Sequence, residues 1–244
     1  MPAVSHDCRV SPDKATAAKA AAEHILQSLA AARSERPLAT IAVSGGSTPK
    51  LMFEAMAAAE FDWSRVHLFW VDERCVPPDH PDSNFGMTTR AWIDRVALPP
   101  EQLHRIEGEL EPGQAAADYQ AGIRRFFELE GDGLPRFDVV HLGMGPDSHT
   151  ASLFPGEELI NDRRGIASSV YVASKQSYRV TLLPGVLLNA AETVFLVSGS
   201  DKAEPLRNVF QEPLDASPRP VQLFARESAN VRWFLDEAAG GYLR

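Results

Sequence analysis

The sequence predicts an α/β fold: a three-layer α/β/α sandwich built on a mostly parallel, Rossmann-like sheet. Short apolar runs of strand length alternate along the chain with helical patterns, several of them ten or more residues long. Glycine-rich or charged turns directly follow several of these runs, which is typical of the ends of parallel strands. The loops rich in proline and glycine, at 76–81, 131–135 and 213–220, are short. We therefore expect a single domain over residues 1–244.

The elements can be justified in chain order. A long helix begins at Ser11-Pro12 and runs to about Arg33, because proline suits the first helical turn and alanine the helix interior. Apolar runs predict strands at 38–43, 66–71, 137–142 and 194–197. Weaker strand patterns lie at 171–173 and 179–183, and 231–235 could form a last strand at the edge of the sheet. Helical patterns begin at Pro49, extend over 83–96 and 111–130, and return as shorter helices near Leu187 and between 202 and 210.

Composition and charge exclude several classes of partner. The formal net charge is −9 at pH 7, which argues against a nucleic acid or an anionic membrane, since both bind clustered Lys and Arg. The two cysteines, Cys8 and Cys75, are far apart and indicate a reducing compartment without a disulfide framework. The N-terminus lacks a secretory signal pattern, and no run of about 18 apolar residues is present to span a membrane. We expect a cytoplasmic protein.

The most informative segment is the turn at 143–156, which follows the apolar run 137–142. Asp147 and His149 lie two residues apart on this turn, at the place where a parallel strand should end. An acid beside an imidazole at such a point predicts acid–base chemistry. A structural histidine that donates to a carbonyl is the alternative for His149. By contrast, His141 lies inside the apolar run, so we interpret it as a satisfied core residue.

Two further strand ends carry polar residues that suit an anion. The run 38–43 ends at Ser44 and is followed by a turn that opens a helix, formed by Gly45, Gly46, Ser47 and Thr48. Free N–H groups and the positive end of the helix dipole make such a turn an anion site, although a merely capped helix is an equal alternative. Lys202 and Arg179 lie near other inferred strand ends and could neutralise the same anion; read singly, each would be a surface charge.

Asp72, Glu73 and Arg74 directly follow the apolar strand 66–71, so they indicate a site, with a helix cap or an ion pair as alternatives. Several other chemistries lack their motifs. The histidines show no zinc spacing, and there is no Gly-x-Ser-x-Gly elbow or Walker lysine. Ser148 occupies the third glycine position of a dinucleotide fingerprint, which argues against a nicotinamide cofactor. We expect no cofactor and no metal.

Three motifs, in order along residues 40–210, resemble 6-phosphogluconolactonases of the glucosamine-6-phosphate isomerase/lactonase superfamily. They are Ser44-Gly45-Gly46-Ser47-Thr48-Pro49, Val71-Asp72-Glu73-Arg74 with His80-Pro81-Asp82-Ser83-Asn84, and the segment 142–156. That family's turn usually reads Gly-x-Asp-Gly-His, and here Ser148 replaces the glycine. If this position needs a positive φ, serine costs roughly 1 kcal/mol there.

The resemblance implies hydrolysis of 6-phospho-D-glucono-1,5-lactone to 6-phosphogluconate in the pentose phosphate pathway, without metal or redox cofactor. It implies that His149 moves the protons, that Asp147 orients the imidazole or a sugar hydroxyl, and that Arg74 stabilises charge at the carbonyl. The remaining residues would bind substrate and its phosphate: Gly45, Gly46, Ser47, Thr48, Asp72, Arg179 and Lys202. The partner is then a small phosphorylated sugar lactone, and we expect a monomer or small homo-oligomer.

Two other functions stay open. Glucosamine-6-phosphate deaminases of the same superfamily have a glutamate five residues after the histidine, which completes a proton relay; here Phe154 stands there. A non-catalytic sugar-phosphate-binding module of a regulator is the second alternative. A regulator is expected to carry a DNA-binding segment, for which a single α/β domain with a charge of −9 leaves no room.

Overall fold

A seven-stranded parallel sheet forms the centre of the molecule. The computed structural model describes residues 7–96 and 98–243. The strand order is β1-β10-β9-β6-β2-β3-β5, and every neighbouring pair is parallel. The strands are β1 (Asp7–Ser11), β2 (Ala39–Val43), β3 (Val66–Trp70), β5 (Leu103–His104), β6 (Val139–Leu142), β9 (Glu192–Val197) and β10 (Val231–Asp236). The predicted parallel sheet is confirmed.

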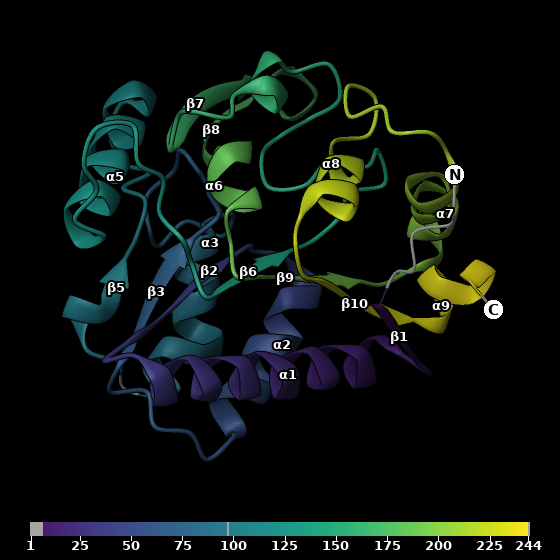
Figure 1. Cartoon of the computed structure of the whole chain (residues 1–244), viewed down its shortest axis with the longest axis horizontal. Coiled ribbons are helices and arrows are strands. Elements are labelled where there is room, and N and C mark those ends of the chain that lie inside the picture. Colours follow the sequence, from purple (N-terminus) through teal and green to yellow (C-terminus); the bar gives the residue numbers. More distant parts are fainter. Residues whose placement is uncertain (1–6, 97, 244) are drawn as a thin grey trace.

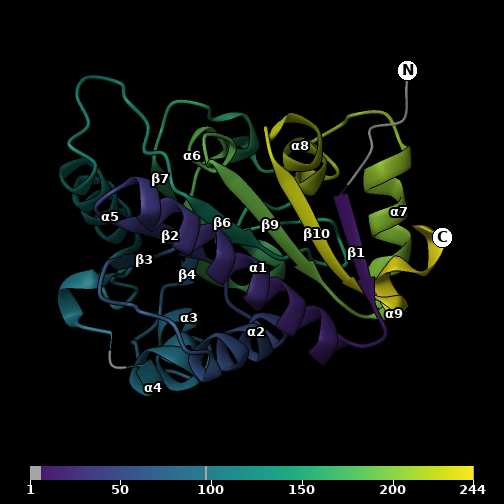
Figure 2. The same ribbon diagram turned by 60° about the horizontal axis from the view of Figure 1, so that its bottom comes forward.

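Helices cover both faces of this sheet, as Figures 1 and 2 show. One face carries α1 (Lys14–Glu35) and α2 (Ser47–Ala58). The other carries α5 (Pro112–Phe126), α6 (Pro184–Leu188) and α8 (Pro220–Glu227), while α7 (Ala203–Gln211) and α9 (Glu237–Gly240) lie near β1 and β10. The three-layer arrangement is therefore as predicted.

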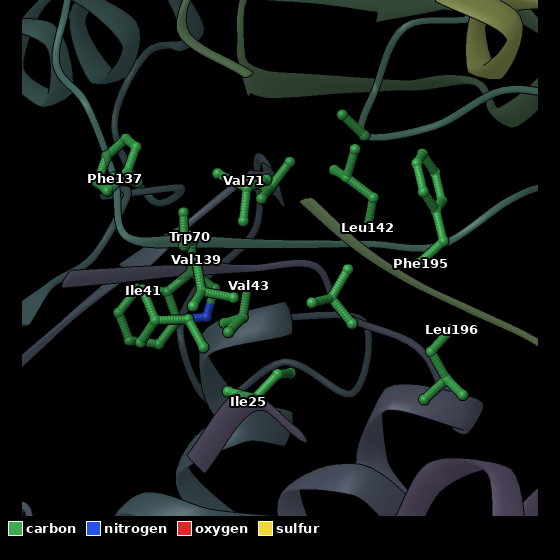
Figure 3. Packing of buried hydrophobic residues seen from close by; sticks show 14 of the residues in the cluster. Ile25, Ile41, Val43, Trp70, Val71, Phe137, Val139, Leu142, Phe195 and Leu196 are labelled. Carbon is green, nitrogen blue, oxygen red and sulfur yellow. The ribbon is translucent and has the colours of Figure 1, made fainter. Parts of the chain in front are cut away.

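The core lies where the central strands meet these layers. All residues of β2, β6 and β9 are buried, and most of them are apolar, because these strands are covered on both faces. Figure 3 shows Ile41 and Val43 of β2 together with Ile25 of α1 and Phe195 of β9. This packing fixes the strand ends, and therefore the loops that follow them, in a defined arrangement.

A second, three-stranded sheet stands beside the first. It is antiparallel, in the order β4 (Asp72–Arg74), β8 (Ser177–Leu182) and β7 (Ala167–Val172). The strand patterns at 171–173 and 179–183 thus belong to a separate sheet rather than extending the parallel one. Two strands joined by a tight turn pair with each other in antiparallel fashion. Their local sequence pattern does not show whether such a hairpin joins the main sheet or forms a separate one.

Several expectations about individual elements are wrong. The segment 231–235 is not an edge strand, because β1 pairs with β10 on its outer side. By contrast, the helix predicted over 83–96 is confirmed, although a π-helical turn at Thr89–Ile93 lies between its α-helical parts α3 (Asn84–Thr88) and α4 (Asp94–Val96). The helix expected to reach residue 130 ends at Phe126. The sequence analysis does not predict the strands β1 and β5 or the helix α8. β1 contains polar residues, β5 has only two residues, and both lie at the edges of the sheet.

Candidate active site

A cavity of about 570 Å³ opens at the carboxyl ends of β9, β6, β2 and β3, which are adjacent in the sheet. Ligands bind α/β sheets at this edge. Nine of the ten predicted site residues line the cavity, and the tenth, Asp147, is hydrogen-bonded to one of the nine. The nine are Gly45, Gly46, Ser47, Thr48, Asp72, Arg74, His149, Arg179 and Lys202. The fold therefore brings together residues that are up to 157 positions apart, from 45 to 202.

The turn before α2 has the backbone of an anion site. Gly46 has a φ of 126°, in the region that favours glycine, and no side chain caps the start of α2 with a hydrogen bond. The first N–H groups of the helix therefore lack intrahelical partners where they meet the cavity. Thr48 Oγ1 lies 2.9 Å from Ser198 Oγ and joins this turn to the loop after β9. The capped-helix alternative lacks its capping bond.

Alternation along β4 separates the three charges that follow β3. Asp72 and Arg74 line the cavity, whereas Glu73 between them points away from it, as successive side chains of a strand do. Glu73 is buried and accepts hydrogen bonds from the N–H groups of Asn84 and Phe85, both at 2.7 Å. Burial raises the pKa of Glu73 although these bonds oppose the rise. Glu73 is therefore the helix cap anticipated as an alternative for this motif.

Asp72 has an ion-pair partner in the second sheet. Its Oδ2 lies 4.0 Å from the Arg179 guanidinium and accepts a hydrogen bond of 2.7 Å from Ser152 Oγ. Arg179 is nine-tenths buried, its Nε has no hydrogen-bond partner among the described residues, and its guanidinium lies 5.5 Å from the centre of the Phe154 ring. Burial lowers the pKa of Arg179, and the charge of Asp72 works against that. Such a half-paired buried cation is suited to an anionic ligand.

His149 is held by an acid on one side and a ring on another. Its Nδ1 lies 2.5 Å from Asp147 Oδ1, and its imidazole stacks on Phe154 with centroids 4.2 Å apart and planes inclined by 21°. Burial opposes ionisation of Asp147, but the hydrogen bonds and the charge of His149 together outweigh it and lower the pKa of Asp147 to about 2. A carboxylate at Nδ1 fixes the proton there, so Nε2 carries the free lone pair. The structural alternative, donation from His149 to a carbonyl, is not seen among the described residues.

The turn that carries this pair is strained and closely packed. Ser148 has a φ of 64° and Ala151 a φ of 53°, so two non-glycine residues adopt the left-handed conformation. The Ser148 carbonyl accepts a hydrogen bond of 3.1 Å from the N–H of Val221 in α8. At Gly145, an added Cβ would lie 2.1 Å from His149 Nδ1. Only glycine leaves room there for the imidazole.

Comparison with known proteins places the chain in a family. A family model for glucosamine-6-phosphate isomerases/6-phosphogluconolactonase matches residues 12–233. The chain belongs to this family. It is 39% identical over 236 residues to a 6-phosphogluconolactonase of Nostoc sp., covering 96% of this chain and 97% of that protein. It is 38% identical to one of Synechocystis sp., covering 86% and 87%. The structure of 6-phosphogluconolactonase from Leishmania guyanensis is similar, with a TM-score of 0.82, 28% identity and coverage of 97% and 98%.

The family's deaminase branch can be separated from this chain at Phe154. This position, where the deaminases are expected to have a glutamate, holds a buried aromatic ring stacked on His149. The ring offers no carboxylate, so the imidazole has one acidic partner, Asp147, among the described residues. The resemblance to the lactonase branch of the family agrees with this geometry.

Several cavity-lining residues were not among the predicted site residues, including Asn84, Lys175 and Ser198. Asn84 donates a 2.8 Å hydrogen bond to the Asp72 carbonyl, and its Oδ1 would lie 1.8 Å from a Cβ added at Gly45. Lys175, exposed at the β7–β8 turn, and Ser198 also line the cavity. Asn84 could have been predicted, because it belongs to the motif at 80–84. Lys175 and Ser198 reach the cavity only through the fold.

Lys202 and His141 complete the comparison with the sequence predictions. Lys202 Nζ lies 2.6 Å from Asp201 Oδ2, and its side chain is 16% exposed, so it is not a free surface charge. His141 is fully buried, and burial lowers its pKa to about 3. It is a core residue as predicted, but it is not satisfied, since neither ring nitrogen has a partner among the described residues.

Residues 7–96 and 98–243 lack two further features. No group of three or more His, Cys, Asp or Glu side chains is placed to hold a metal ion. No described helix combines the length and the hydropathy needed to cross a membrane.

Proposed function

We propose that this protein hydrolyses 6-phospho-D-glucono-1,5-lactone to 6-phospho-D-gluconate, acting as one lactonase domain on a small phosphorylated sugar lactone. The observation that carries the proposal is the Asp147–His149 pair, which leaves Nε2 free in a cavity that also contains an uncapped helix start and the buried cation Arg179. The names of the relatives at 39% and 38% identity support the same reaction. We expect a cytoplasmic monomer or small homo-oligomer.

The reaction needs a base, and the geometry assigns this role to His149. Nε2 takes a proton from a water molecule as its oxygen attacks the lactone carbonyl carbon. The imidazolium that forms is stabilised by the carboxylate of Asp147, 2.5 Å from Nδ1. When the bond to the ring oxygen breaks, His149 returns the proton to that oxygen. The balance is one water added and one ester bond broken.

Three cationic side chains stabilise the negative charges of the reaction and of the substrate. Arg74 lines the cavity beside Asp72, and its Nη1 donates a 2.6 Å hydrogen bond to the Asp82 carbonyl, which fixes the guanidinium. We assign to it the charge that develops on the carbonyl oxygen. The phosphate is bound by the residues that match an anion site in backbone and charge: Gly45, Gly46, Ser47, Thr48, Arg179 and Lys202. Asp72 positions Arg179 and is available to a sugar hydroxyl.

A coupled assay tests this function. Freshly made lactone is hydrolysed with and without enzyme, and 6-phosphogluconate is measured by its oxidation with a dehydrogenase that reduces NADP. Spontaneous hydrolysis gives the baseline. Glucosamine 6-phosphate is the control substrate, and we expect no ammonia from it because Phe154 offers no relay carboxylate. Ammonia release would assign the chain to the deaminase branch, and binding of sugar phosphate without turnover would favour the non-catalytic module.

A further inference from the structure

One aromatic ring contacts both the base and a cation of the site. The Phe154 ring stacks on the His149 imidazole at 4.2 Å and lies 5.5 Å from the Arg179 guanidinium carbon. Phe154 is only 5% exposed. No step of the reaction proposed above uses this ring, and its two polar neighbours come from different parts of the chain, the loop after β6 and the strand β8.

The ring is itself held by the small sheet. Phe154 forms a separate apolar cluster with Val170 and Val172 of β7, with Leu159 packed against it. β7 pairs with β8, and in that pairing Val170 is opposite Arg179. The β7–β8 hairpin therefore packs against the Phe154 ring and also carries Arg179, the cation that contacts this ring.

The chemistry of the contacts gives the ring two effects. A stacked ring restricts rotation of the imidazole about its side-chain bonds and so directs Nε2 in one orientation. The face of a phenyl ring is also electronegative, so it stabilises a guanidinium in a site that is largely desolvated. Asp147 alone holds His149 at one atom, Nδ1, and leaves the plane of the ring undetermined.

We propose that Phe154 is a positioning residue that sets the plane of the His149 imidazole and the place of the Arg179 guanidinium together. It couples the orientation of the base to the binding of the phosphate. This inference rests on the proposed lactonase function for its kinetic half, whereas its binding half depends only on Arg179.

Phe154→Leu tests the proposal, because leucine keeps apolar bulk and removes the aromatic face. We expect kcat for the phosphorylated lactone to fall about three- to tenfold, as for loss of an aromatic stack, and the affinity for 6-phosphogluconate in calorimetry to fall by a similar factor. Phe61→Leu is the matched control, since the Phe61 ring also packs on an aromatic ring, that of Trp63, and lies 5.5 Å from a guanidinium, that of Arg33, but does not line the cavity. This control should lower thermal stability and leave kcat and affinity within about twofold.

Double variants separate positioning from general destabilisation. On a His149→Ala background, Phe154→Leu should cause no further loss of the residual kcat, measured at high enzyme concentration, but should still weaken product binding. On an Arg179→Ala background, it should no longer weaken binding. A further loss of kcat on the His149→Ala background, a further loss of binding on the Arg179→Ala background, or equal losses in Phe61→Leu would overturn the proposal.

The two hypotheses fail in different ways. A wild-type protein that never accelerates lactone hydrolysis rejects the proposed function. The binding comparison of Phe154→Leu with and without Arg179→Ala still decides, in that case, whether Phe154 places the Arg179 guanidinium.

Discussion

Replacing Ser148 by glycine should stabilise the protein, because this residue stands in a conformation that serine disfavours. Its φ is 64°, and the left-handed region costs an L-residue roughly 1–2 kcal/mol. Glycine removes that strain but adds unfolded-state entropy worth roughly 0.5–1 kcal/mol. The central values leave a gain of about 0.75 kcal/mol in the free energy of unfolding, or roughly 1.5–3 °C in Tm for a chain of this size.

Urea and thermal unfolding of the wild type and Ser148→Gly measure this difference. Ser168→Gly is the matched control, because Ser168 lies in β7 with an ordinary negative φ. There glycine should lower the free energy of unfolding by about 0.5–1 kcal/mol. If Ser148→Gly is destabilised like the control, the left-handed conformation carries no strain, and the reasoning fails.

Three further predictions concern function. His149→Ala should lower kcat by about 10² to 10⁴ with little change in substrate affinity; a variant that retains more than half of the wild-type kcat would remove His149 from the mechanism. Lys202→Ala and Arg179→Ala should each weaken binding of the phosphorylated lactone by roughly 1.5–3 kcal/mol and spare any turnover of unphosphorylated gluconolactone. Equal losses on both lactones would refute the phosphate assignment. Gly145→Ala, whose Cβ would lie 2.1 Å from His149 Nδ1, should displace the imidazole and lower kcat about a hundredfold while phosphate binding persists; an unchanged kcat would contradict the packing argument.

Much of the fold was predictable because the central strands are buried on both faces. Continuous apolar runs such as those of β2 and β9 are a strong local signal, and the turns after them carry most of the site. The edge strand β1 gave no such signal, since its five residues Asp7–Ser11 alternate between exposed and partly buried positions before Ser11. An edge strand such as β1 is stabilised by pairing with a distant strand, here β10, and the local sequence does not show this pairing.

Site residues that directly follow a strand could be predicted from the sequence. Which of their side chains face the cavity could not. The sequence places Asp72, Glu73 and Arg74 equally after β3, and only the antiparallel pairing of β4 decides that the outer two face the cavity. Phe154 was noted for what it replaces, whereas its contacts with His149 and Arg179 require two distant segments to meet. Contacts of that kind arise from tertiary packing alone.

The backbone of a single residue, Val71, is hydrogen-bonded to both sheets, which holds the two halves of the site at a fixed distance. The N–H of Val71 donates to Val43 in the parallel sheet at 2.9 Å, and its carbonyl accepts from Leu182 of the small sheet at 2.8 Å. The base follows a strand of the first sheet, while Arg179 belongs to the second. Relative sliding of the sheets would break one of these two bonds, so the backbone fixes how far His149 lies from Arg179. If Arg179 binds the phosphate as proposed, the fold itself sets the length of sugar phosphate that reaches the base.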